Sequence, residues 1–130
     1  MPPEPDEARS PALPGFRFRR ALRLTRRTDF ERAMKDGRRS VDATLTLWAY
    51  PNGLAHTRFG LVVGRKHGDA VRRNRLKRLL REAFRLSQHD LPPGYDLVCA
   101  PRTGVELTLA ACTASLVRLA TRLARHSADR

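Results

Sequence analysis

The sequence predicts an α+β fold, an α/β sandwich with one small sheet. Helical periodicity recurs in residues 28–37, 69–87 and 108–125. Strand-like alternation or short apolar runs occupy the intervals between them. In chain order the segments give a helix, two or three strands, a helix, a strand and a helix. At 130 residues the chain has the length of one domain that folds without disulfides or metal ions.

The first 15 residues differ in composition from the rest of the chain. They combine prolines with acidic residues, at Pro2, Pro3, Pro5, Pro11, Pro14, Glu4, Asp6 and Glu7. Such a segment can neither pack into a core nor propagate a helix. We therefore expect a disordered, proline-rich tail at residues 1–15 and a single folded domain at 16–130.

The first helix has a start signal and a stop signal. Thr28 is a candidate N-cap, and Glu31 follows three residues later, as in a capping box. Gly37 can adopt the left-handed conformation that often ends a helix.

Three strands are expected after this helix. Residues 44–50 alternate, residues 51–53 (Pro-Asn-Gly) form a turn, and residues 58–63 alternate more loosely, which predicts two antiparallel strands. The apolar run 95–100 is the third strand, and Pro101 closes it.

Two longer helices complete the pattern. Asp69 is the expected cap of a helix that reaches about Ser87. The last helix, from about Thr108 to Arg125, carries arginines opposite an apolar stripe of Leu109, Cys112, Leu116, Leu119, Ala120 and Leu123.

Charge is the dominant compositional feature. Lysine and arginine total 26 against 13 acidic residues, a net charge of +13 with a pI near 11.5. Such a balance is typical of proteins that bind a polyanion, nucleic acid above all. Arginine predominates, and its planar guanidinium grips phosphate through paired hydrogen bonds. Genomic base composition accounts for part of the arginine excess over lysine, but not for the net charge.

The segment 64–85 concentrates this charge. It holds nine basic and two acidic residues, and its apolar residues share one sector that we expect to dock on the sheet: Leu76, Leu79, Leu80, Ala83 and Leu86. The opposite face carries Asn74, Arg78, Arg81 and Arg85, flanked by Lys77, Arg73 and Arg75. Solvated faces normally mix opposite charges, whereas here only Glu82 is available. A bound polyanion explains this face better than solvation alone.

The same segment resembles the signature of the bacterial ribonuclease P protein family. Its core is Arg-Asn-Arg-Leu-Lys-Arg at 73–78, directly after an apolar strand and a glycine-bearing loop. Residues 24–30 (Leu-Thr-Arg-Arg-Thr-Asp-Phe) resemble the start of the family's first helix, and the order of elements is similar from about residue 20 to 125.

The resemblance implies a fold, an activity and partners. It implies a four-stranded sheet with three helices and an uncommon left-handed β-α-β crossover. It also implies an accessory subunit that assists a catalytic RNA in removing the 5′ leader of precursor tRNA. Catalysis would belong to that RNA and its Mg²⁺ ions, with no catalytic residue or cofactor on the protein. The implied partners are the catalytic RNA and precursor tRNA in the cytoplasm, with no membrane and no DNA.

Two sets of site residues follow from the resemblance. The catalytic RNA would contact Arg65, Lys66, Arg72, Arg73, Asn74, Arg75, Lys77, Arg78 and Arg81. A cleft for the single-stranded leader would contain Arg26, Arg27, Phe30, Met34 and Trp48, with Tyr50 as an alternative platform. Met34 departs from the family, which commonly has an aromatic residue there. For Phe30 and Trp48 a purely structural role in the core is the alternative.

The remaining reactive side chains suggest no protein catalyst. Cys99 and Cys112 lack the spacing of a zinc or redox pair and read as buried thiols of a cytoplasmic protein, and the N-terminus lacks a secretion signal. The histidines are scattered and expected in loops or at the surface, although His67 could contact a phosphate: His56, His67, His89 and His126.

Two other function classes stay open. A ribosomal or general structural RNA-binding protein would share the charge but would leave leader cleavage unchanged. A DNA-binding regulator would require a helix-turn-helix pair, whereas a strand and a loop precede the basic helix.

Overall fold

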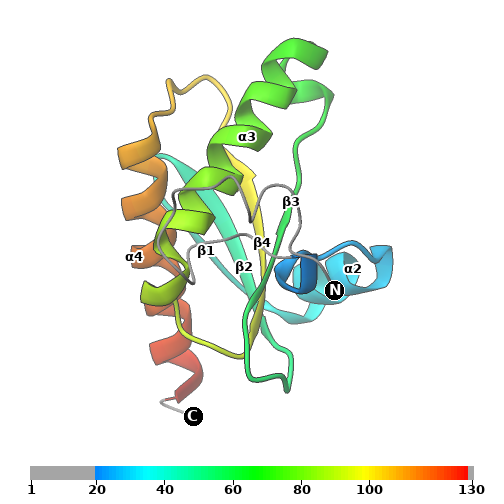
Figure 1. Ribbon diagram of the computed structural model, residues 1–130, viewed down its shortest axis with the longest axis vertical. Helices are drawn as coiled ribbons and strands as arrows, with labels where there is room; N and C mark the ends of the chain where they lie inside the picture. Colours follow the sequence, from blue (N-terminus) through cyan, green and yellow to red (C-terminus); the bar gives the residue numbers. More distant parts are fainter. Residues whose placement is uncertain (1–19, 129–130) are drawn as a thin grey trace, which may run out of the picture.

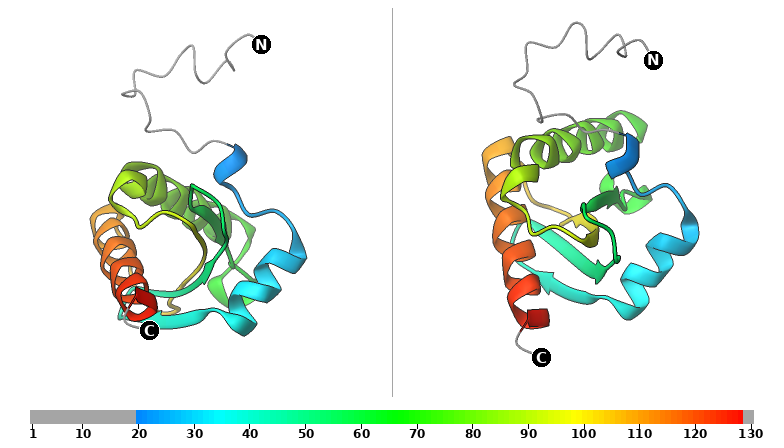
Figure 2. Two further views of the ribbon diagram at one scale, coloured as in Figure 1. Left: turned by 90° about the horizontal axis from the view of Figure 1, so that it is seen from below. Right: turned by 60° about the horizontal axis from the view of Figure 1, so that its bottom comes forward.

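The computed structural model describes residues 20–128, and side chains as far as Arg125. A four-stranded sheet separates α3 and α4 on one face from α2 on the other (Figures 1 and 2). The three helices and the mixed sheet confirm the expected α+β class. The predicted tail 1–15 and the first residues of the predicted domain lie outside the described residues.

The sheet has the strand order β1-β2-β4-β3. Its strands are β1 (Arg38–Val41), β2 (Leu45–Pro51), β3 (Arg58–Leu61) and β4 (Tyr95–Pro101). β2 and β3 run in opposite directions, as predicted, but β4 lies between them, antiparallel to β2 and parallel to β3. β4 takes this place because it is apolar and buried on both faces along nearly its whole length.

The parallel pair β3 and β4 is connected through α3 (Ala70–Ser87). This β-α-β unit carries the basic segment, and it matches the arrangement that the family resemblance implies. The left-handed sense of the crossover stays a prediction.

The main core fills the space between the sheet and the helices α3 and α4. Alternate residues of β2 and β4 face it, and α4 (Leu109–Ala128) contributes the stripe that the sequence predicts. Phe59 of β3 and Phe84 of α3 stack with ring centroids 4.6 Å apart. The buried cluster also includes Leu45, Leu47, Leu80, Leu97, Cys99, Cys112, Leu116 and Leu119.

For α2 (Arg27–Asp36), the predicted start at Thr28 is wrong, whereas the predicted end at Gly37 is right in position and wrong in conformation. The helix already includes Thr28, and Glu31 pairs with Arg27 at 2.8 Å rather than closing a capping box. Gly37 has φ −77°, so it does not adopt the left-handed conformation. Close packing requires glycine here, because a Cβ would lie 2.3 Å from the carbonyl oxygen of Ala33.

The longer helices agree better with the sequence. Asp69 caps α3 by accepting a hydrogen bond from the Arg72 backbone N–H at 2.9 Å. Thr108 precedes α4 and accepts one from the Ala111 N–H at 3.1 Å. The apolar face of α3 is wrong at Leu86, which is exposed, while Phe84 is buried in its place.

The turn between β1 and β2 is fixed to α4 by Asp42. Its carboxylate accepts the Leu45 N–H at 2.8 Å and the Ser115 hydroxyl at 2.6 Å, and it pairs with Arg118. Burial alone would raise the pKa of Asp42, but the bonds from Ser115, Leu45, Arg118 and Thr44 outweigh it and lower the pKa to about 2.

The two cysteines are buried thiols, as predicted. Burial is the main cause that raises both pKa values, for Cys112 to about 11, so neither thiol is activated. Within residues 20–128, no helix is both long enough and apolar enough to cross a membrane.

Candidate nucleic-acid interface

The outer face of α3 presents cations to solvent, because its opposite face is held in the core by Leu76, Leu80 and Ala83. Most of the residues predicted to contact catalytic RNA are exposed: Arg65, Lys66, Arg72, Asn74, Arg75, Arg78 and Arg81. Arg73 and Lys77 are half-buried at the sides of the helix. The predicted set therefore lies along α3 and the turn before it, with most of its members open to solvent.

Charge on this face is hardly compensated. Among the described residues, α3 has one ion pair, which joins Arg85 to Glu82. Arg73 donates a long 3.4 Å hydrogen bond to the Asp69 carbonyl oxygen. The remaining cations have one another as neighbours along the helix, which costs a few tenths of a kcal/mol per like-charged pair. A row of phosphates would remove that repulsion.

The turn η2 (Arg65–His67) before α3 is anchored by a buried histidine. His67 Nδ1 accepts the Gly64 N–H at 3.0 Å, and Nε2 lies 2.9 Å from the Pro101 carbonyl oxygen. Because the Gly64 N–H donates to Nδ1, Nε2 is the nitrogen that donates to the Pro101 carbonyl oxygen. His67 lies in the loop between β3 and α3, as expected, but it is buried rather than at the surface, and both ring nitrogens are occupied within the fold.

The second face of the sheet, beneath α2, carries the aromatic residues. Trp48 and Tyr50 of β2 are two residues apart and therefore point to the same face. Both pack with Phe30 of α2 around the small buried cluster of Leu24, Ala33 and Val98. Both candidate platforms on β2 therefore lie on this face of the sheet.

Phe30 and Met34 lie one turn apart on α2. Phe30 is half-buried, and Met34 is 39% exposed. The Arg32 guanidinium lies 5.9 Å from the centroid of the Tyr50 ring. Phe30 and Trp48 thus belong to a minor core and also remain partly accessible, so the structural and functional readings of these side chains are compatible.

The cations predicted for the cleft differ in their freedom. Arg26 is exposed just before α2. Arg27 is exposed as well, but it donates to the Glu31 carboxylate at 2.8 Å. Arg26 is therefore the more available of the two for a phosphate.

An ionic network holds α2 against the sheet. Arg58 of β3 donates to both carboxylate oxygens of Asp96, at 2.8 and 2.7 Å, and lies 3.6 Å from the Asp29 carboxylate of α2. Asn52 donates to Asp96 at 3.0 Å. The hydrogen bond to Asp96 is the main cause that raises the pKa of Arg58. This network helps to fix the distance between α2 and the sheet, and with it the position of Phe30.

Arg39 belongs to the same surface, although sequence reasoning missed it. It is exposed on β1 directly opposite Trp48, so the two side chains share a face. A strand at 38–41 would have placed it there, but those four residues lack an alternating apolar signal.

No group of three or more histidine, cysteine or acidic side chains in residues 20–128 is arranged to hold a metal ion. The site that the described residues do form is cationic and aromatic, and it suits a nucleic acid.

Comparisons with known proteins agree on one family. The family model described as Ribonuclease P matches residues 18–124. The ribonuclease P protein component of Oleidesulfovibrio alaskensis is 51% identical over 85 residues, which cover 64% of this chain and 68% of that protein. The protein of the same name from Thermotoga maritima is 42% identical over 85 residues, covering 65% and 73%.

Solved structures show the same relationship. The RNase P protein from Thermotoga maritima superposes with a TM-score of 0.70 at 34% identity, over 77% of this chain and 96% of that one. The Staphylococcus aureus RNase P protein gives a TM-score of 0.68 at 27% identity, over 81% and 96%.

Proposed function

Because the chain belongs to the ribonuclease P protein family, whose members are accessory subunits of the endoribonuclease that processes tRNA, we propose that two of its surfaces divide the RNA between them. The outer face of α3 and the turn η2 bind the catalytic RNA. The cleft between α2 and the sheet binds the single-stranded 5′ leader of precursor tRNA. The protein thereby stabilises the active conformation of the RNA and holds the substrate.

The observation that carries the first part is the uncompensated charge of α3. A helix that buries one side and exposes a row of arginines on the other presents donors at a spacing that phosphates can meet. The arginine fork provides paired hydrogen bonds to each phosphate, and binding releases counterions from the RNA.

The second part rests on the composition of the cleft. Phe30 and Trp48 offer aromatic surface, while Arg26 and Arg39 flank it with cations. This combination is typical of surfaces that bind single strands without reading their sequence, where each stacked base contributes about 1–3 kcal/mol. A leader varies in sequence among precursors, so a tolerant surface fits it.

Catalysis belongs to the RNA in this account. Mg²⁺ ions at the RNA active site would activate water and stabilise the leaving oxygen. The protein contributes by neutralising phosphates around that site, which lowers the concentration of Mg²⁺ that the RNA needs to fold and react. We expect this work to take place in the cytoplasm.

The test is reconstitution from purified components. We expect the protein, added to its catalytic RNA and a precursor tRNA, to lower the Mg²⁺ concentration required for 5′ maturation. A general RNA-binding protein of the ribosomal class would bind the RNA and leave the Mg²⁺ requirement unchanged. That second result would contradict the proposal.

A further inference from the structure

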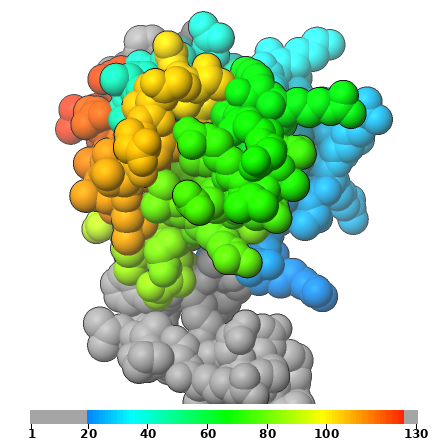
Figure 3. Space-filling model, turned by 90° about the horizontal axis from the view of Figure 1, so that it is seen from above, coloured from blue at the N-terminus to red at the C-terminus, as the bar shows by residue number. Residues whose placement is uncertain are grey.

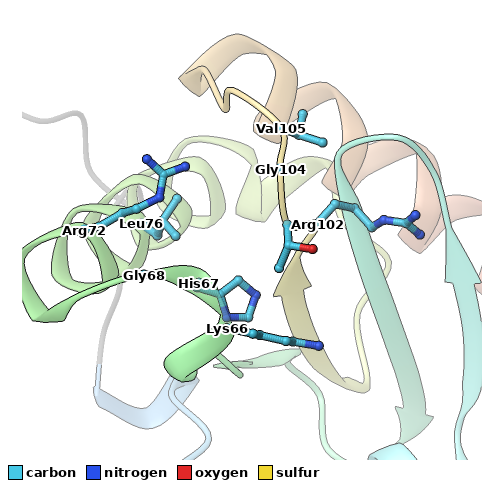
Figure 4. A pocket seen from close by; sticks show the side chains of 9 residues that line it. Lys66, His67, Gly68, Arg72, Leu76, Arg102, Gly104 and Val105 are labelled. Carbon is cyan, nitrogen blue, oxygen red and sulfur yellow. The ribbon is translucent and has the colours of Figure 1, made fainter.

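A pocket of about 160 Å³ opens between the start of α3 and the segment after β4. Arg72 and Leu76 line it from α3, and His67 lines it from η2. Val105 lines it from the segment after β4 (Figure 4). These two segments, green and yellow to orange, lie side by side on the surface (Figure 3). The pocket adjoins the basic face of α3 but is separate from the aromatic surface where α2 meets the sheet.

The pocket combines two apolar side chains, Leu76 and Val105, with the His67 ring and a cationic rim. Leu76 is 9% exposed and His67 4%, and Val105 is half-buried. Lys66, Arg72 and Arg102 are all exposed. Figure 4 shows Arg102 extending from the end of β4, away from α3. A ligand with a flat apolar part and an anionic part would match this gradient.

Both walls of the pocket are held in place without a ligand. The two hydrogen bonds of His67 tie η2 to the end of β4. The Arg102 N–H donates to the Thr44 carbonyl oxygen at 3.0 Å, which fixes the opposite wall. A preformed site loses little conformational entropy when it binds.

Gly68 shapes the rim. Its φ is +116°, and a Cβ at this position would lie 2.6 Å from Arg72 Cδ. Glycine therefore makes room for the aliphatic stem of Arg72 to run along the edge of the pocket.

The rim carries positive charge without local compensation. The nine described lining residues include no carboxylate, and no ion pair of Lys66, Arg72 or Arg102 is found within residues 20–125. The neighbouring Asp69 accepts the Arg72 backbone N–H as the helix cap. Lys66 and Arg72 at the opening, with Arg102 beside the far wall, favour an anionic ligand.

The size of the pocket limits the flat part of the ligand. An apolar protein cavity of about 150 Å³ holds one benzene molecule. A pocket of this volume therefore has room for a single six-membered ring, and a pyrimidine base is such a ring. We propose that the pocket receives one unpaired pyrimidine nucleotide of the catalytic RNA, with its base against Leu76 and Val105 and its phosphates at the cationic rim.

This inference rests on the proposed function, since it assigns a subsite to the RNA that α3 binds. The catalytic RNA is the favoured source because the pocket shares Lys66 and Arg72 with the surface proposed for it. The leader is the competing source, and the cleft under α2 already accounts for it.

The first experiment measures binding to the protein alone. Uridine 5′-monophosphate is titrated into the ¹⁵N-labelled full chain, with inorganic phosphate and adenosine 5′-monophosphate as comparisons. We expect saturating shifts at Gly68, Gly104 and Val105, with tighter binding of the uridine nucleotide than of either comparison. Equal binding of inorganic phosphate, or shifts spread along α3 instead, would overturn the proposal.

The second experiment fills the pocket in the holoenzyme. Val105→Trp should weaken binding of the catalytic RNA about fivefold or more, in line with the loss of one buried base. Arg102→Ala should act in the same direction. Arg125→Ala removes an equal charge from an exposed position near the end of α4 and is the matched control, expected to bind nearly as wild type does. The ¹⁵N spectra of the variants establish that they are folded.

The outcomes separate the two proposals and the two RNA sources. If Val105→Trp binds the catalytic RNA as tightly as wild type does, the pocket proposal fails while the proposed function stands. A second outcome is that Val105→Trp binds the catalytic RNA normally and weakens only the binding of leader-bearing precursor, measured at saturating catalytic RNA. That outcome would overturn the assignment of the pocket to the catalytic RNA. If the wild-type protein does not bind the catalytic RNA at all, the proposed function fails first.

Discussion

The Phe30 ring lies directly against the backbone of Gly60. A Cβ added at Gly60 would lie 2.5 Å from Phe30 Cζ and 2.6 Å from Cε1, closer than nonbonded carbons approach. Gly60 is on β3, directly opposite Val98 of the central strand β4. Because Gly60 has no side chain, α2 lies close enough to the sheet for Phe30 to pack on it next to Trp48.

Gly60→Ala should therefore displace Phe30 and damage the leader cleft. We expect a loss of stability of about 1–3 kcal/mol from overpacking, and weaker binding of leader-bearing precursor tRNA. The measurements are chemical denaturation and precursor affinity of the holoenzyme. Gly64→Ala is the matched control, since a Cβ there meets nothing within 4 Å. Equal leader affinity in both variants would contradict the assigned contact.

Phe30→Ala should weaken precursor binding in proportion to leader length. Stacking of a base on the ring is worth about 1–3 kcal/mol, so affinity for a long leader should fall roughly fivefold or more. Affinity for tRNA without a leader should stay the same. An equal loss for leaderless tRNA would show that Phe30 serves the minor core alone.

Met34→Phe should strengthen leader binding. Met34 is exposed one turn after Phe30, so a larger ring can be accommodated toward solvent. An aromatic ring stacks on a base where a thioether only covers its edge, and a severalfold gain in affinity for leader-bearing precursor is expected. Precursors truncated to a leaderless form provide the control, and a gain there too would argue against stacking.

Asp42 makes part of the stability depend on acid pH. Its pKa is about 2 in the folded protein against 3.8 as the ordinary value, so folding favours the ionised form. This contribution, about 2 kcal/mol, is complete above pH 4 and disappears as the pH falls from about 4 to 2.

The measurement is the free energy of unfolding against pH for wild type and Asp42→Asn. The wild type should be the more stable of the two at neutral pH, and the difference should shrink through this range. A difference that stays constant down to pH 2 would refute the assignment to Asp42.

Sequence periodicity predicts the long elements and the cationic face of α3. The α3 pattern identifies both its buried side and its cations, because 18 residues provide enough turns to define a face. The sequence pattern did not predict β1, because this strand is four residues long and forms through pairing with β2. The pairing of β2 with β4 likewise depends on contacts distant in sequence, which local patterns do not encode.

Single positions were harder to predict than elements. Leu86 follows the helical period yet lies beyond the reach of the core, while Phe84 turns inward to stack on Phe59. His67 looked like a surface residue because its neighbours are charged, and its burial arises from a hydrogen bond to Pro101 across the fold. Such placements depend on tertiary packing.

The most direct test of the account is the salt dependence of binding between the protein and its catalytic RNA. Each phosphate contact adds roughly −0.9 in a duplex, or −0.7 in a single strand, to the slope of log affinity against log salt. Replacing Arg73 and Arg75 together by Ala should weaken binding and make this slope shallower by about 1 to 2, whereas Arg125→Ala should leave it nearly unchanged. An unaltered affinity and slope in the double variant would contradict the claim that α3 holds the RNA.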